Sequence, residues 1–213
     1  MVENSMSTAV AVACVCGSIG ASGIRLCPEH HKYYLGDKEL ASVSRVIRET
    51  WPIKKSFEYA DPVVLEHARE RGVRIDHYAA EYVKTGKVRI LAGEWREVVE
   101  RVQMIAEWWR RRETKAATQV IFHDDEVAGT ADFLTTNGDI WDLKCVSAID
   151  PTYFLQLGAY ADLCEKQHGT AGNLAFIHLP KEGPRFIAAD LQQCRDDWRT
   201  LRQMYLMVKR RSK

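Results

Sequence analysis

Three strand-like runs that follow one another constrain the fold of this sequence most. They cover residues 118–123, 128–135 and 139–146, and turn signals at Asp124-Asp125 and Asn137-Gly138 separate them. Turns this short join antiparallel neighbours, so the sequence predicts a three-stranded meander. Because helical patterns flank the meander on both sides, the sequence predicts an α/β fold with a central mixed sheet flanked by helices.

The helical patterns are marked by periodicity and by capping residues. Apolar side chains recur every three or four positions between Glu94 and Arg112, which predicts an amphipathic helix. Asp61-Pro62 and Asp150-Pro151 each supply an N-cap and a first-turn proline, for helices that end near Gly86 and Lys166. The remaining expected elements are a short helix within 40–47 capped by Ser42 or Ser44, strands over 173–179 and 185–189, and a final helix after Asp190.

Size, charge and hydropathy limit the function classes. The 213 residues suit one main domain with a small appendage. Thirty basic and twenty-nine acidic residues leave a net charge of +1, which excludes a protein that coats nucleic acid through a general positive field. The apolar run from Thr8 to Cys16 lacks the basic start of a signal peptide and alternates like a short strand. We therefore expect a soluble, reduced, cytoplasmic protein of a bacterial or phage-infected cell, without a membrane partner.

Two carboxylates and a lysine mark the meander as the candidate active site. Gly129-Thr130-Ala131-Asp132 is followed, after nine residues, by Asp142-Leu143-Lys144. Strand alternation places Asp142 and Lys144 on one face, and the hairpin brings Asp132 onto the neighbouring strand. Carboxylates suit Mg²⁺ or Mn²⁺, which neutralise charge on a phosphodiester, while a lysine can orient or deprotonate the attacking water.

An ordinary structural explanation exists for the same three residues. A D-x-K tripeptide is common by chance, and Asp142 and Lys144 would then form an exposed strand pair beside a turn residue. The surrounding side chains argue against this reading, since charges at the edge of a buried core need a partner or a metal. Those apolar neighbours are Ile140, Trp141, Leu143 and Val146.

The order of three segments resembles the nuclease signature of the RecB-like branch of the PD-(D/E)XK superfamily, of the phage and bacterial exonuclease type. The segments are G-T-A-D, I-W-D-L-K and Gln156-Leu157-Gly158-Ala159-Tyr160, and the match runs from about Leu40 to Tyr160. The resemblance implies a restriction-endonuclease-like core with a central mixed β-sheet flanked by helices. It also implies that Asp132, Asp142 and the backbone carbonyl of Leu143 bind the metal while Lys144 acts on the water.

The resemblance implies further site residues on two helices. His77, in a context similar to the family's G-x-x-x-H, would be the third metal ligand, and Asp76 beside it is a rival. Gln156 and Tyr160 lie four residues apart on one helix face and would contact the DNA backbone. Without the resemblance this pair is ordinary half-buried packing. Gln119 departs from the family, whose members often carry an acidic residue there, so an additional ligand is in doubt.

The first 38 residues contain a second candidate metal site. Cys14-Val15-Cys16 and Cys27-Pro28-Glu29-His30 form a C-x-C…C-x-x-H pattern. Three thiolates and one imidazole can bind Zn²⁺ tetrahedrally. Such a site would stabilise the folded arm, which is too short to form its own hydrophobic core. An iron–sulfur cluster and uncoordinated thiols are the alternatives. The later cysteines, Cys145, Cys164 and Cys194, are read as small buried hydrophobes.

These features together predict an arm over 1–38 that binds zinc and a nuclease domain over 39–213. The expected activity is Mg²⁺- or Mn²⁺-dependent exonucleolytic cleavage of DNA in recombination, repair or phage DNA metabolism. A helicase, recombinase or single-strand-binding protein could be a partner. The alternative is a catalytically silent DNA- or protein-binding module on a nuclease scaffold, acting within a larger complex. Basic residues that could meet phosphates are Arg110, Arg111, Arg112, Lys115 and those of Lys209 to Lys213.

Overall fold

The computed structural model describes residues 23–27, 30, 32–51 and 61–211. The chain divides into two compact units, Met1–Leu40 and Ala41–Lys213. The strand expected between Thr8 and Cys16 lies outside the described residues. None of the helices within the described ranges combines the length and the apolar character that crossing a membrane requires.

Short antiparallel strands form the first unit. β1 (Ile24–Cys27) pairs with β2 (Lys32–Leu35), and β2 pairs with the first part of β3 (Lys38–Ser42). Their buried side chains are Ile24, Cys27, Tyr33 and Leu40. The sequence predicts only a loop-rich arm here, because strands of four or five residues between glycines are too short to show a convincing alternation.

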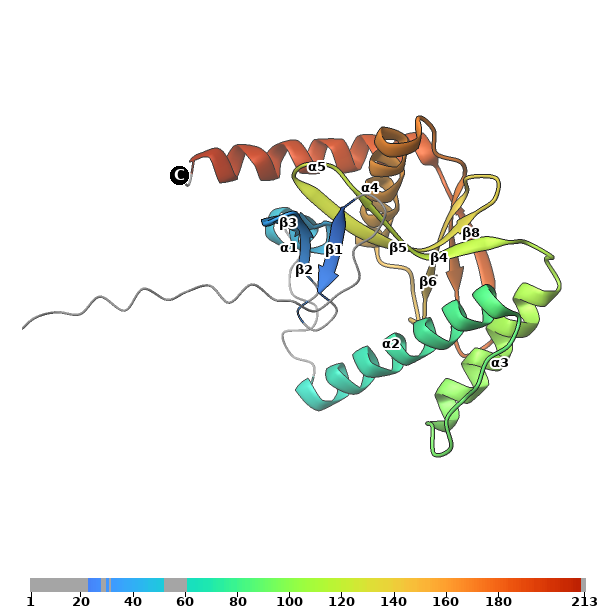
Figure 1. The fold of residues 1–213 in the computed structure, drawn as a ribbon. Coiled ribbons are helices and arrows are strands. Elements are labelled where there is room, and N and C mark those ends of the chain that lie inside the picture. Colours follow the sequence, from blue (N-terminus) through green and yellow to red (C-terminus); the bar gives the residue numbers. More distant parts are fainter. Residues whose placement is uncertain (1–22, 28–29, 31, 52–60, 212–213) are drawn as a thin grey trace, which may run out of the picture. The chain divides into compact units, whose positions relative to one another are not determined.

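Five helices and five further strands make up the rest of the described chain (Figure 1). They are α1 (Val43–Thr50), α2 (Pro62–Thr85), α3 (Arg96–Arg110), β4 (Ala116–His123), β5 (Val127–Thr135), β6 (Ile140–Lys144), α4 (Pro151–His168), β7 (Leu174–His178), β8 (Arg185–Ala189) and α5 (Leu191–Arg211). The order confirms the predicted meander between helices and the two later strands.

The strands of the second unit form one mixed sheet. β4, β5 and β6 are consecutive antiparallel neighbours, as predicted. The last residues of β3 run parallel to the start of β5, and β7 runs parallel to β6 after the α4 crossover. β8 is antiparallel to β7 and ends the strand order. The sheet thus has the mixed character that the sequence predicted.

Alternating side chains of the sheet supply two separate hydrophobic cores. Ile140 and Phe176 belong to the core formed with α1, α4 and α5, whereas Trp141 and Ile177 belong to the core formed with α2 and α3. Figure 1 shows α4 and α5 on one side of this sheet and α2 and α3 on the other. Since both faces are covered, β7 is buried along its whole length.

Local capping chemistry sets the helix boundaries. Ser42, Asp61 and Asp150 each accept a hydrogen bond from a first-turn N–H, at 3.1, 2.8 and 2.8 Å. Gly86 ends α2 in the left-handed region, with φ of 72°. The first helix begins at Val43, later than the expected start near residue 40, because the preceding residues belong to β3.

Gly158 allows α4 and α5 to approach closely. A Cβ atom added to Gly158 would lie 2.0 Å from the carbonyl oxygen of Cys194 on α5. Since that neighbour is backbone, the helices would have to separate to admit a methyl group.

We predict that Gly158→Ala lowers the free energy of unfolding by about 2 to 3 kcal/mol through overpacking. Gly72→Ala is the matched control, because Gly72 lies within α2 and a Cβ there has nothing within 4 Å. That control should stabilise the protein by about 0.5 to 1 kcal/mol through helix propensity. Denaturant unfolding of the wild type and both variants measures the difference, and equal stability of the two variants would contradict the close approach.

Candidate active site

The candidate site lies where β6 separates from β5. The two strands pair at Phe133↔Trp141 and Leu134↔Ile140, and no further pair follows on this side. Instead, the Asp132 carboxylate accepts a hydrogen bond of 2.8 Å from the backbone N–H of Leu143. A side-chain hydrogen bond therefore takes the place of the next backbone pair between β5 and β6. The two strands separate at this point and leave a gap in which polar groups can gather.

Lys144 occupies the α4 side of this gap. Its ammonium lies 2.5 Å from a carboxylate oxygen of Asp142 and donates a 3.0 Å hydrogen bond to Oε1 of Gln156. The same nitrogen lies 4.7 Å from the centre of the Tyr153 ring. The strand alternation predicted from the sequence thus brings Asp142 and Lys144 together, with Asp132 on the neighbouring strand.

The electrostatics of the cluster reflect two buried carboxylates beside one cation. Burial, together with the charge of Asp142, raises the pKa of Asp132 to about 7. Burial works against the charged form of Lys144, but Asp142 and Asp132 outweigh it and raise the pKa of its ammonium above the ordinary value. Lys144 therefore keeps its proton in the metal-free site and acts there as a positive charge and a donor.

The α2 residue that interacts with the cluster is Asp76. Burial raises the pKa of Asp76 well above its ordinary value, and repulsion from Asp132 and Asp142 adds to the shift. The neighbouring His77 is exposed, and its ring contacts the edge of the Tyr78 ring at 5.6 Å between centroids. Of the two candidates that the sequence offers on this helix, the aspartate is the one whose carboxyl group interacts electrostatically with Asp132 and Asp142, whereas the histidine is exposed.

Gln156 and Tyr160 support Lys144 from α4. Nε2 of Gln156 donates a 2.6 Å hydrogen bond to the hydroxyl of Tyr160, while its Oε1 accepts from Lys144. Tyr160 is only 3% exposed, so its side chain has no free surface for a DNA backbone. The expected helix pair is present at the site, and its observed contacts orient the lysine.

The glycine of the G-T-A-D segment makes room for that tyrosine. A Cβ atom on Gly129 would lie 2.7 Å from Cε1 of Tyr160 and 2.8 Å from Cγ2 of Val43. Only a residue without a side chain lets the ring pack against β5 here. Gly129 and Asp132 therefore serve one site from a single strand, the first by admitting Tyr160 and the second through its carboxylate.

The donor groups at the gap fit a hard divalent cation. Asp132 and Asp142 provide two carboxylates, and the Leu143 carbonyl lies between Asp142 and Lys144 in the chain. As the side chains stand, no three histidine, cysteine, aspartate or glutamate groups of the described chain enclose a metal position. Mg²⁺ does not require such a cage, because it keeps several waters and usually binds one or two carboxylates. A bound cation would also relieve the repulsion that raises the pKa of Asp132.

The predicted zinc site is described only in part. Sγ of Cys27 lies 3.2 Å from Nδ1 of His30, so two of the four expected ligands are neighbours. Cys14 and Cys16 lie outside the described residues. Among the later cysteines, Cys164 and Cys194 are buried as expected, whereas Cys145 is half-buried.

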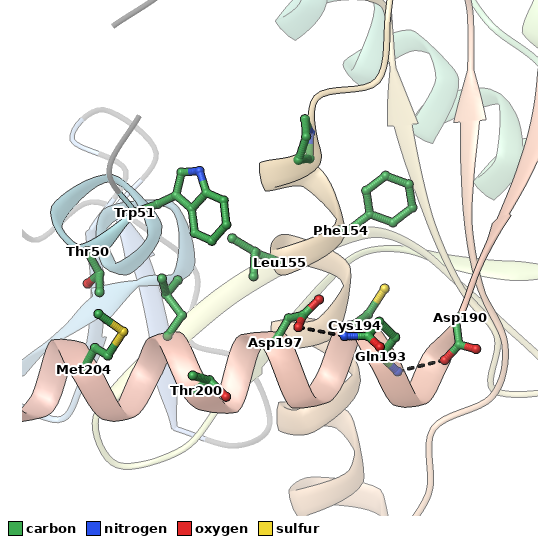
Figure 2. A pocket seen from close by; sticks show the side chains of 12 residues that line it. Thr50, Trp51, Phe154, Leu155, Asp190, Gln193, Cys194, Asp197, Thr200 and Met204 are labelled. Carbon is green, nitrogen blue, oxygen red and sulfur yellow. Dashed lines mark hydrogen bonds between the residues drawn. The ribbon is translucent and has the colours of Figure 1, made fainter. Parts of the chain in front are cut away.

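An apolar cavity of about 570 Å³ lies between α1, α4 and α5, away from the carboxylates (Figure 2). Phe154 and Leu155 line it from α4, whereas Tyr153 and Gln156 of the same helix turn contact Lys144. Its remaining lining residues include Trp51, Met204, Asp190 and Asp197. The two carboxylates would repel a phosphodiester, and the apolar wall offers it no positive charge. We therefore do not assign this cavity as the substrate site.

Comparison with known proteins supports the fold. No protein-family model and no curated protein matches the sequence. The fold is similar to that of a candidate exonuclease from Eubacterium rectale, with a TM-score of 0.53, 16% identity, and 80% and 81% of the two chains covered. An alkaline exonuclease from Laribacter hongkongensis (TM-score 0.39, 14% identity, 81% and 93% covered) and a phage related exonuclease from Haemophilus somnus (0.37, 12%, 82% and 96%) also match. The first likeness confirms the α/β fold with a central mixed sheet flanked by helices that the resemblance implies.

We predict that Asp132 contributes a loss of stability to the metal-free protein as pH rises from 3.8, the ordinary pKa of an aspartate, to about 7. The sign follows from proton binding. The folded-state pKa of Asp132 lies above the unfolded value, so the folded state binds more protons across this window and a rising pH favours unfolding. Asp132→Asn should flatten this dependence and raise the Tm at pH above the window by several degrees. Thermal unfolding in chelator at several pH values tests it, and parallel curves for the two proteins would count against a buried carboxylate cluster.

Proposed function

We propose that this chain is a Mg²⁺- or Mn²⁺-dependent deoxyribonuclease that degrades DNA from an end. The observation that carries the proposal is the meeting of Asp132, Asp142 and Lys144 at the gap between two diverging strands. The similarity to the fold of the Eubacterium rectale protein supports a nuclease. Hydrolysis of a phosphodiester needs both positive charge at the phosphate oxygens and a positioned water, and this site offers groups for both.

Asp132, Asp142 and the Leu143 carbonyl are the residues that would hold the metal. The bound ion would neutralise charge on the phosphate and lower the pKa of a coordinated water. Lys144 would offset charge at the transition state and orient the attacking water through its N–H donors. Gln156 and Tyr160 would fix the direction of the Lys144 side chain, because their hydrogen bonds hold it from α4.

Asp76, rather than His77, is our candidate for the third acidic group. The charges of Asp132 and Asp142 add to the rise of its pKa, which supports a role for this carboxyl group beside the same ion or its waters. The proposal therefore replaces the expected histidine ligand by a carboxylate. This substitution favours Mg²⁺ or Mn²⁺ over softer metals, because the ligand set then consists of oxygen atoms alone.

The biological setting follows from the proposed chemistry. An end-dependent deoxyribonuclease would act in DNA recombination, repair or phage DNA metabolism, in the cytoplasm of the host cell. A helicase, recombinase or single-strand-binding protein would supply or consume its DNA ends. The silent-module alternative requires that turnover be absent although Lys144 forms an ion pair with Asp142 and the Asp132 carboxylate lies at the same gap, bound to the N–H of Leu143.

The arm is proposed to bind Zn²⁺ through Cys14, Cys16, Cys27 and His30. The contact between Cys27 and His30 supports this, since both side chains approach one point. Zinc content of untreated protein, compared with that of Cys27→Ser, tests the proposal independently of activity; equal zinc in both would overturn it.

We predict that Asp142→Ala and Lys144→Ala each reduce DNA cleavage by at least about a hundredfold, since each removes a group that stabilises the transition state. End-labelled linear DNA and closed circular DNA, incubated with Mg²⁺, Mn²⁺ or chelator, provide the measurement. Linear DNA should be cut only with metal, and circular DNA should resist. Equal cleavage by the wild type and both variants would refute the catalytic assignment.

In the same assay, Asp76→Asn and His77→Asn form a matched pair on adjacent residues. The first should lose at least about tenfold of the activity and require more metal, because it removes a carboxylate from the cluster. The second should stay close to the wild type, because its side chain lies outside the cluster. The opposite ranking would restore the histidine as the ligand.

A further inference from the structure

A basic and aromatic surface lies at the start of β8, the last strand in the sheet order. We define this β8 surface by Arg185, Phe186, Trp108 and Arg112. The Arg185 side chain is 60% exposed, and its ion pair with Glu182 is long, at 3.9 Å. Phe186 is 40% exposed, a large exposed fraction for a phenylalanine side chain.

Strand register connects the β8 surface to the candidate site. Lys144 of β6 pairs with His178 of β7, and His178 pairs with Arg185 of β8. Paired residues share a face of the sheet, so Arg185 lies on the same face as Lys144 and two strands away. Two strand spacings amount to about 10 Å. A nucleic-acid strand whose scissile phosphate reaches Lys144 can therefore place a nearby phosphate at Arg185.

The opposite face of the same strand offers a stacking platform. The rings of Phe186 and Trp108 lie 6.2 Å apart at 25° to each other. The guanidinium of Arg112 covers them from one direction, 4.1 Å from the Trp108 ring centre and 5.0 Å from that of Phe186. A hollow of about 240 Å³ lies beside Trp108, with Met104 and Pro184 in its wall. Unpaired bases stack on arrangements of this kind, in which an aromatic ring lies next to open space and is accompanied by a second ring and a guanidinium.

We propose that the β8 surface binds a single-stranded DNA segment adjacent to the phosphodiester that is cleaved. Arg185 contacts a backbone phosphate on the face of Lys144, and the strand then passes over the sheet edge that β8 forms, so that the Phe186–Trp108 platform on the opposite face stacks an unpaired base. The inference rests on the proposed function for the position of the cleaved bond. Charge distinguishes this surface from the cavity between α1, α4 and α5, whose charged lining residues are Asp190 and Asp197. At the β8 surface, Glu107 and Glu182 are each paired with an arginine, Arg111 and Arg185, and Arg112 adds a further positive charge. The substrate class is therefore DNA with a single-stranded end or overhang.

The test measures DNA binding separately from hydrolysis. Fluorescence anisotropy of a labelled oligothymidine and of a blunt duplex, in chelator and over a range of KCl concentrations, gives the Kd without turnover. Arg185→Ala should raise the Kd for the single strand about five- to tenfold and reduce the salt slope by about 0.7, the value for one lost phosphate contact. Phe186→Leu should weaken the single strand at least about fivefold and leave the duplex unchanged, because leucine keeps apolar packing but loses the stacking face.

Arg96→Ala is the matched control. Arg96 is exposed and begins α3. It lies about 20 Å along the helix from Arg110, at the end where Trp108 and Arg112 belong to the β8 surface. The substitution removes the same charge as Arg185→Ala. This control should leave both Kd values unchanged. With metal present, Arg185→Ala should raise KM and spare kcat, which a general loss of structure would not do.

Two results separate this inference from the proposed function. If the wild type binds the oligothymidine and Arg185→Ala and Phe186→Leu weaken binding while no condition yields cleavage, the β8 surface stands and the nuclease proposal fails. If DNA is cleaved but Arg185→Ala and Phe186→Leu bind as the wild type does, or if Arg96→Ala weakens binding equally, the β8 surface is overturned and the nuclease proposal stands.

Discussion

The hydrogen bond from the Leu143 N–H to the Asp132 carboxylate is the interaction on which the candidate site depends. In a continuous antiparallel ladder, the residues after Phe133↔Trp141 would pair backbone to backbone and leave no room for other groups. Here β6 turns toward β7 instead, with which it forms a parallel ladder over five residues. The divergence costs ladder bonds between β5 and β6, and the Asp132 carboxylate satisfies the N–H of Leu143 on that edge. The pairing to β7 holds the other edge of β6, so a gap lined by carboxylates opens on the β5 side.

The buried charges in that gap have to be held as a unit. Two carboxylates at close range repel each other, and burial makes the repulsion stronger, as the raised pKa of Asp132 shows. Lys144 compensates part of this charge, and it is itself held by Gln156 and Tyr160 from α4. The site therefore joins two strands of the sheet to a helix that packs on one face. Two carboxylates beside one lysine leave a net negative charge, which a cation bound at the carboxylates would neutralise.

Much of this arrangement was predictable because it is encoded locally. Caps, first-turn prolines and strand alternation act within a few residues, so the helix boundaries and the meander followed from the sequence. Contacts between distant segments were less accessible. The close approach of Gly158 to α5 and the burial of Tyr160 depend on how helices pack, which no short-range pattern encodes. The strands β1 and β2 were missed for a different reason, since their four-residue alternation is too short to stand out.

The choice between His77 and Asp76 illustrates a signal that the sequence does contain. The buried residues of this part of α2 are Ile75, Tyr78 and Ala79, and they define the face that packs inward. At about 100° per residue, His77 lies about 150° from the centre of that face, whereas Asp76 lies about 105° from it. A ligand must stand at the edge of the buried face, where it can reach a site beneath the helix without entering the apolar core. Motif spacing favoured the histidine, but helical phase favours the aspartate, and phase is the more direct measure because it states where a side chain can reach.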